Sequence, residues 1–119
     1  MAATIGFRCP LIARKTTGLP NPAAAVDVFA DGRGRFVVIY NPSSATRDVL
    51  ALARSSDGVH FELGCTLSLP GGEAPAAYPS VIRGRDGDWR VVYSAGGKAR
   101  IKVARFSSEW LEDCFVHKG

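Results

Sequence analysis

Short apolar runs, separated by turns rich in glycine and proline, make up most of this chain. Apolar alternation and β-branched residues predict a series of short strands, over residues 26–29, 36–40, 49–54, 60–67, 78–83, 89–93 and 99–106, with residues 110–116 closing the chain. A run over residues 5–12 predicts one more strand, which Pro10 directs to the edge of a sheet. No segment has the period of an amphipathic helix of useful length, and we expect one helical turn at most over residues 108–111. This pattern is typical of an all-β fold.

The second half of the chain repeats the pattern of the first. An aromatic–Val–Tyr triplet recurs at an offset of 53 residues and an Ala-Arg dipeptide at an offset of 51, in Phe36, Val38, Tyr40 with Trp89, Val91, Tyr93 and in Ala53, Arg54 with Ala104, Arg105. A repeated four-stranded unit of about fifty residues has the size of a β-propeller blade. An accidental likeness between two β-meanders is the alternative.

We therefore expect one domain over residues 1–119, made of two four-stranded antiparallel meander sheets that resemble propeller blades. In this division a strand and connector occupy residues 1–18. The first blade-like repeat covers residues 19–70, and the second covers residues 71–119.

The composition is that of an ordinary soluble domain, with 46% hydrophobic and 22% charged residues. The net charge is +4, but the arginines are scattered along strands and turns, which favours solvated faces over a nucleic-acid surface. No segment resembles a secretory signal or is long and apolar enough to cross a membrane. We expect a cytoplasmic protein whose partners include neither nucleic acid nor membrane.

The chain has three cysteines, Cys9, Cys65 and Cys114, which lie far apart and in no metal-ligand spacing. We expect them to be small buried apolar residues in a reducing compartment. No motif points to a metal or to a cofactor, so we expect neither.

Three segments together resemble a known family. They are LPNPAAAVDVFADGRGRFVVIYNPSSATRDVLALARSSDGVHFE, AAYPSVIRGRDGDWRVVYS and ARIKVARFSSEWL. Their order and spacing resemble the last two blades of the sialidase-like six-bladed β-propellers, whose repeats carry the BNR or Asp-box motif. The resemblance extends over residues 19–111, which is most of this chain but only part of a family domain.

The resemblance implies a substrate-binding role for Arg47. The family places an arginine from a loop-to-strand junction against the substrate carboxylate, and Arg47 in SSATRDVLALARSSDG stands at such a junction. A planar guanidinium makes two parallel charge-assisted hydrogen bonds to a carboxylate, as this role requires. The alternative is an exposed strand-end arginine bonded to loop carbonyls.

The resemblance also implies that Tyr78 is a catalytic nucleophile. The family is an exception among glycosidases because it uses a tyrosine, whose proton a nearby glutamate accepts. Tyr78 stands at the corresponding strand start, although the Pro79 that follows it departs from the main family pattern. The alternative is a strand-end tyrosine with its ring in the core and its hydroxyl at the rim.

Residues 55–61 resemble a degenerate Asp-box, which in the family is a structural turn. The resemblance implies that the side chains of Ser55 and Asp57 bond the hairpin turn at Gly58 and that Phe61 packs beneath it. His60 is then a surface residue of the hairpin.

Other parts of the family's site are missing. Its two further arginines, its acid/base aspartate and its nucleophile-partnering glutamate belong to blades that this chain lacks. Glu73 is the nearest substitute, but we interpret it as a solvated loop residue. Ala23, Ala24 and Ala25 stand where relatives often carry Asn-Ser-Gly. We expect a module directed at acidic sugars that is incomplete as a lone-chain glycosidase.

Two further functional interpretations stay open. One is a non-catalytic binding or assembly module, and the other is a truncated piece without independent activity. Two blades alone would leave an apolar face and open strand edges in water. We therefore expect self-association, as a trimer with six blades or as a simpler dimer.

Overall fold

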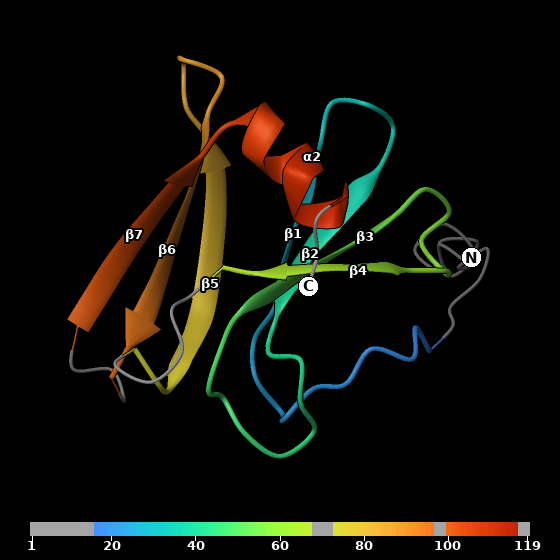
Figure 1. Ribbon diagram of the computed structural model, residues 1–119. Helices are drawn as coiled ribbons and strands as arrows, with labels where there is room; N and C mark the ends of the chain where they lie inside the picture. Colours follow the sequence, from blue (N-terminus) through green and yellow to red (C-terminus); the bar gives the residue numbers. More distant parts are fainter. Residues whose placement is uncertain (1–15, 68–72, 97–99, 117–119) are drawn as a thin grey trace, which may run out of the picture.

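The computed structural model describes residues 16–67, 73–96 and 100–116. The first sheet has the order β1-β2-β3-β4, with β1 at Asp27–Ala30, β2 at Phe36–Tyr40, β3 at Ala51–Ser55 and β4 at Glu62–Thr66. The second sheet has the order β5-β6-β7, with β5 at Ala76–Arg83, β6 at Trp89–Ala95 and β7 at Arg100–Phe106. All pairings are antiparallel, and β5 lies beside β1 and β2 (Figure 1). The predicted all-β class is confirmed.

The second sheet has three strands in the described part of the chain where four were predicted. A helix, α2, covers Ser108–Val116, so the expectation of one helical turn at most was wrong. Ser107 caps this helix, because its hydroxyl accepts the N–H of Trp110 at 3.1 Å. Leu111, Cys114 and Phe115 are buried at the i, i+3, i+4 spacing of one helical face. The predicted strand over residues 5–12 lies outside the described residues.

Helix α2 packs on β4 at the outer edge of the first sheet (Figure 1). A disulfide joins Cys65 of β4 to Cys114 of α2, which corrects the expectation of free thiols for these two residues. The sequence hides this pair because 49 positions separate it and the helix that aligns it was not predicted. Cys9 lies outside the described residues. No helix in the described segments has the length and hydropathy needed to cross a membrane.

Ion pairs also hold α2 in place. Glu112 Oε2 lies 2.6 Å from Arg35 Nη2 and 3.1 Å from Arg54 Nη1. Burial raises the pKa of Glu112, but the hydrogen bonds and charges of the two arginines outweigh it and leave that pKa below its ordinary value. The guanidinium of Arg54 also stacks on Phe115, 4.3 Å from the ring centre.

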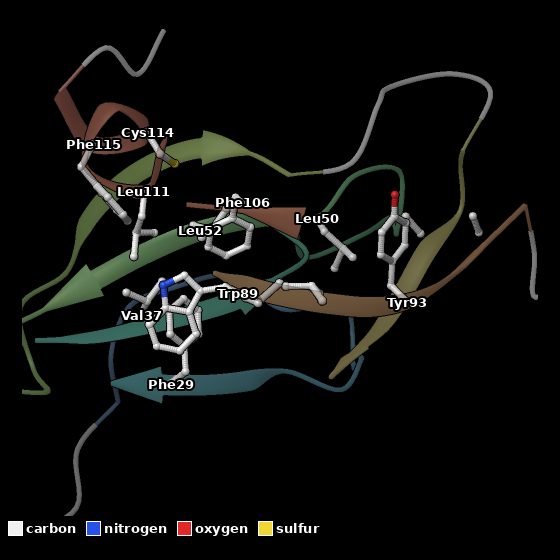
Figure 2. Packing of buried hydrophobic residues seen from close by; sticks show 14 residues of the cluster. Phe29, Val37, Leu50, Leu52, Trp89, Tyr93, Phe106, Leu111, Cys114 and Phe115 are labelled. Carbon is white, nitrogen blue, oxygen red and sulfur yellow. The ribbon is translucent and has the colours of Figure 1, made fainter. Parts of the chain in front are cut away.

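The main core lies between the two sheets (Figure 2). Phe29 of β1 meets Trp89 of β6 with ring centres 4.5 Å apart, and Phe106 of β7 extends this aromatic contact. The cluster also contains Val37, Ile39, Leu52 and Val91 from the two sheets, Leu50 just before β3, and Leu111 and Phe115 of α2. A smaller cluster covers the opposite face of the first sheet, with Tyr40, Ala51 and Ala53 at its centre.

The sequence repeat does not align the two sheets residue by residue. Phe36 is 46% exposed on the outer face of the first sheet, whereas Trp89, its match at offset 53, is 4% exposed in the core. The core positions of β2 are Val37 and Ile39 instead. Successive strand residues point to opposite faces, so an error of one position exchanges the two faces.

Candidate functional site

Arg47 lies in the loop between β2 and β3, beside the start of β5. The N–H of Ala76 donates to the carbonyl oxygen of Arg47 at 2.7 Å, which ties the loop to the second sheet. Arg47 Nη2 donates to the carbonyl oxygen of Ala23 at 3.2 Å. The Arg47 guanidinium carbon lies 5.7 Å from the centre of the Tyr78 ring. The structure therefore brings together the two residues that the family resemblance assigns to the site.

Tyr78 occupies a β-bulge in β5. Ala77 pairs with Ser94 and Ser80 pairs with Val92, so Tyr78 and Pro79 together oppose the single residue Tyr93. Tyr78 has a positive φ of 58°, and its side chain is exposed whereas the flanking residues are buried. The bulge therefore turns the Tyr78 ring out of the core and toward Arg47, which excludes the interpretation of Tyr78 as a ring in the core.

The backbone at this site is strained in two places. Among the described residues other than glycine, only Ala23 and Tyr78 have a positive φ, at 59° and 58°. Asn21 holds the turn that contains Ala23, because its side-chain amide both accepts from the N–H and donates to the carbonyl oxygen of Ala24. Both strained residues contact Arg47. Strained conformations of this kind concentrate at functional sites, so their convergence on one arginine supports a site there.

Asn41 is a site residue that the sequence pattern placed in an ordinary loop. Its side chain is buried, and its Nδ2 donates to the carbonyl oxygens of Val49 and Ala76 at 2.8 Å each. These bonds fix both ends of the Arg47 loop against β5. Its Oδ1 has no hydrogen-bond partner within the part of the chain that the structure describes. An asparagine directly after a buried strand and before a proline is the one local signal for such a role.

Glu73 is buried, which contradicts its interpretation as a solvated loop residue. Its Oε1 accepts the hydroxyl of Tyr93 at 2.9 Å, and its Oε2 lies 3.1 Å from Lys102 Nζ. Burial and the hydrogen bond from its hydroxyl to Glu73 raise the pKa of Tyr93 to about 12. Glu73 therefore pairs with Tyr93 of β6, at one end of the core (Figure 2).

The Asp-box-like turn lies at the end of β3 and in the loop that leads to β4. The structure brings together its four residues, Ser55, Asp57, Gly58 and Phe61. The hydroxyl of Ser55 accepts the N–H of Gly58 at 2.8 Å and donates to Asp57 Oδ1 at 2.9 Å. Gly58 has a φ of 79°, a conformation that favours glycine. Phe61 packs on the smaller cluster.

His60 and Asp57 interact on the surface of this turn, with Nδ1 and Oδ2 2.7 Å apart. Hydrogen bonds from the His60 side chain and from the backbone N–H groups of His60 and Val59 hold the pKa of Asp57 below its ordinary range. The five residues of β3, which span roughly 17 Å, separate this turn from Arg47. The turn therefore takes no part in the site around Arg47 and Tyr78.

The site offers a cationic guanidinium beside an exposed tyrosine ring, where the loop between β2 and β3 meets the start of β5. Such a pair suits a ligand whose anionic group binds the guanidinium while its ring or chain packs against the Tyr78 side chain. No group of three or more histidine, cysteine, aspartate or glutamate side chains in the described residues is arranged to hold a metal ion.

Comparison with known families gives a match to the model described as a BNR repeat-like domain, over residues 11–91. The matched range includes Arg47, Tyr78 and the turn at Gly58. Neither the curated proteins nor the solved structures contain a significant match. The family model matches more than half of the residues of this chain, so the chain belongs to the family of BNR repeat-like domains.

Proposed function

We propose that this chain is a sialidase-like propeller module that binds acidic sugars and is incomplete as a lone-chain glycosidase. The observation that carries the proposal is that Arg47, from a loop of the first sheet, and Tyr78, from a strand of the second, lie side by side. Membership of the BNR repeat-like family supports the same class of function.

Arg47 is the proposed carboxylate-binding group. A guanidinium has five N–H donors, and the bond to Ala23 uses one of them. The Tyr78 ring and the Ala23 carbonyl orient the guanidinium, which reduces the freedom that a ligand has to remove. The half-buried position also strengthens a bond to a carboxylate relative to one in open water.

Tyr78 is the proposed nucleophile of a complete site. Its chemistry needs a carboxylate that accepts the phenolic proton. We do not assign Glu73 to this role, because Glu73 already binds Tyr93 and Lys102. We expect a single chain to bind an acidic sugar without hydrolysing its glycosides. A non-catalytic assembly module is the second candidate, and the exposed apolar residues on both outer sheet faces favour it.

Binding of N-acetylneuraminic acid, measured by saturation-transfer NMR and calorimetry, tests the proposal. We expect Arg47→Ala to weaken binding by about 10- to 100-fold, the equivalent of one charge-assisted hydrogen bond. Arg47→Lys should recover only part of the affinity, because an ammonium cannot form the two parallel bonds. Tyr78→Phe should retain most of it, because the phenyl ring still supports the guanidinium.

Arg85→Ala is the matched control, since Arg85 is exposed beside a turn of the second sheet. It should leave the affinity unchanged, and a neutral sugar such as galactose should not bind through Arg47. Equal affinities for the wild type and Arg47→Ala would show that the carboxylate is not bound there.

A further inference from the structure

The outer face of the first sheet is apolar and hollowed. Val28 of β1 pairs with Val38 of β2, and Ala53 of β3 pairs with Leu63 of β4, so one apolar row crosses all four strands. A groove of about 380 Å³ lies between this face and the connector over residues 17–26. It is lined chiefly by Leu19, Val26, Val28, Phe36, Val38 and Phe61. This volume has room for several aliphatic side chains.

The outer face of the second sheet is apolar and has no such groove in the described residues. Ile101 is 78% exposed, Ile82 64% and Val103 62%, and all three point away from the core. Val92 pairs with Val103 across β6 and β7 and continues the patch. Aliphatic side chains gathered on a sheet face at this exposure mark a surface that another protein covers.

Two arginines on this second face are already paired with aspartates. Arg90 Nη1 lies 2.8 Å from Asp86 Oδ1, and Arg105 Nε lies 2.9 Å from Asp88 Oδ2. An approaching apolar surface therefore meets Arg90 and Arg105 with their charges already neutralised and needs no acidic group opposite these two arginines. An apolar occupant is thus favoured over an acidic one.

We propose that a second copy of this chain is the occupant, and that the outer face of its second sheet docks on the outer face of the first sheet of its neighbour. The protruding aliphatic residues of one face then enter the groove of the other. The contact is sheet on sheet and apolar, like the one that joins the two sheets within each chain (Figure 2). The proposal does not depend on sugar binding.

The arrangement of the two faces decides the kind of assembly. The two outer faces belong to different sheets, whose inner faces pack against each other. The contact therefore joins two different surfaces and is heterologous. A dimer held by one such contact leaves one first-sheet face and one second-sheet face uncovered. Further copies add until a ring closes. Three copies bring six sheets together, which is the closed assembly that we expect.

Light scattering on a sizing column, over a range of concentrations and without sugar, tests this contact. The wild type should form a discrete oligomer, with a trimer expected. Val103→Lys on the second sheet and Phe36→Lys on the first should each abolish it and give monomers. Val116→Lys is the matched control, because Val116 is 66% exposed on α2 and lies on neither face. Circular dichroism should show all variants to be folded.

Mixing the two interface variants distinguishes this contact from a symmetric one. Phe36→Lys keeps an intact second-sheet face and Val103→Lys keeps an intact first-sheet face, so an equimolar mixture should form a 1:1 dimer. If second-sheet faces pack on each other instead, Phe36→Lys alone will still dimerise and the proposal fails. A wild type that is monomeric at every concentration also overturns it, as does aggregation that neither variant reduces.

Discussion

Tyr93 shows how much of this site is decided one side chain at a time. Its hydroxyl is buried beside the carboxylate of Glu73, which in turn binds Lys102. Tyr78, on the opposing strand, is turned outward by its bulge and lies beside Arg47. Two tyrosines at neighbouring positions of one sheet thus have different surroundings, and only Tyr78 has its ring in the exposed site.

The raised pKa of Tyr93 predicts a loss of stability in alkali. The unfolded chain releases this proton near pH 10 and the folded chain near pH 12, so the stabilisation is complete below pH 10 and is lost as pH rises toward 12. The free energy of unfolding should fall by about 2–3 kcal/mol over this interval from Tyr93 alone. The free energy of unfolding, measured with urea between pH 8 and pH 12, should fall less steeply with pH for Tyr93→Phe than for the wild type.

If the free energy of unfolding depended on pH in the same way in the wild type and in Tyr93→Phe, Tyr93 would not hold its proton more tightly in the folded chain.

At the scale of elements, Gly64 allows α2 to pack closely on β4. A Cβ at this position would lie 2.7 Å from Phe115 Cε1 and 3.0 Å from both Cys114 Sγ and the carbonyl oxygen of Leu52. The helix and the strand therefore approach so closely that residue 64 has no room for a side chain. This close packing accompanies the disulfide between the same two elements.

Gly64→Ala should consequently lower the free energy of unfolding by about 1–3 kcal/mol, as overpacking of a core does. In a Phe115→Leu background the added methyl group meets a smaller side chain, so the loss should be smaller. A double-mutant cycle measured by urea unfolding gives the coupling directly. Additive effects of the two substitutions would show that Gly64 and Phe115 do not meet.

At the scale of the whole molecule, the two sheets share one hydrophobic core. Trp89 of the second sheet contacts Phe29 of the first, and α2 adds Leu111 and Phe115 to the same cluster. Asp27 of β1 also binds the second sheet, because its Oδ2 accepts the N–H of Val81 at 2.8 Å. Neither sheet retains its full core without the other.

The two sheets should therefore unfold in a single transition. In the Val103→Lys background, for which we expect a monomer, Trp110→Phe leaves Trp89 as the single tryptophan. Its fluorescence, which reports the contact between the sheets, should change at the same urea concentration as the far-UV circular dichroism of the whole chain. If the fluorescence changes first, the sheets separate before they unfold.

The amino-acid sequence by itself determined the strands and turns of this protein, because these depend on local alternation and on glycine, proline, serine and aspartate at fixed positions. The segment over 36–40 agrees with β2 residue for residue, and the predicted strands that correspond to the other six observed ones differ from them by at most two positions at either end. The family resemblance then singled out Arg47 and Tyr78, which lie side by side in the structure.

Only the tertiary structure decided which sheet faces meet, which carboxylate is buried and which cysteines pair. The face of each strand depends on a single-residue register that a repeat offset of 53 misses by one. The burial of Glu73 depends on Tyr93 and Lys102, and the role of Asn41 depends on Ala76 in the other sheet. Such contacts join residues far apart along the chain, and no local pattern specifies them before the sheets pack.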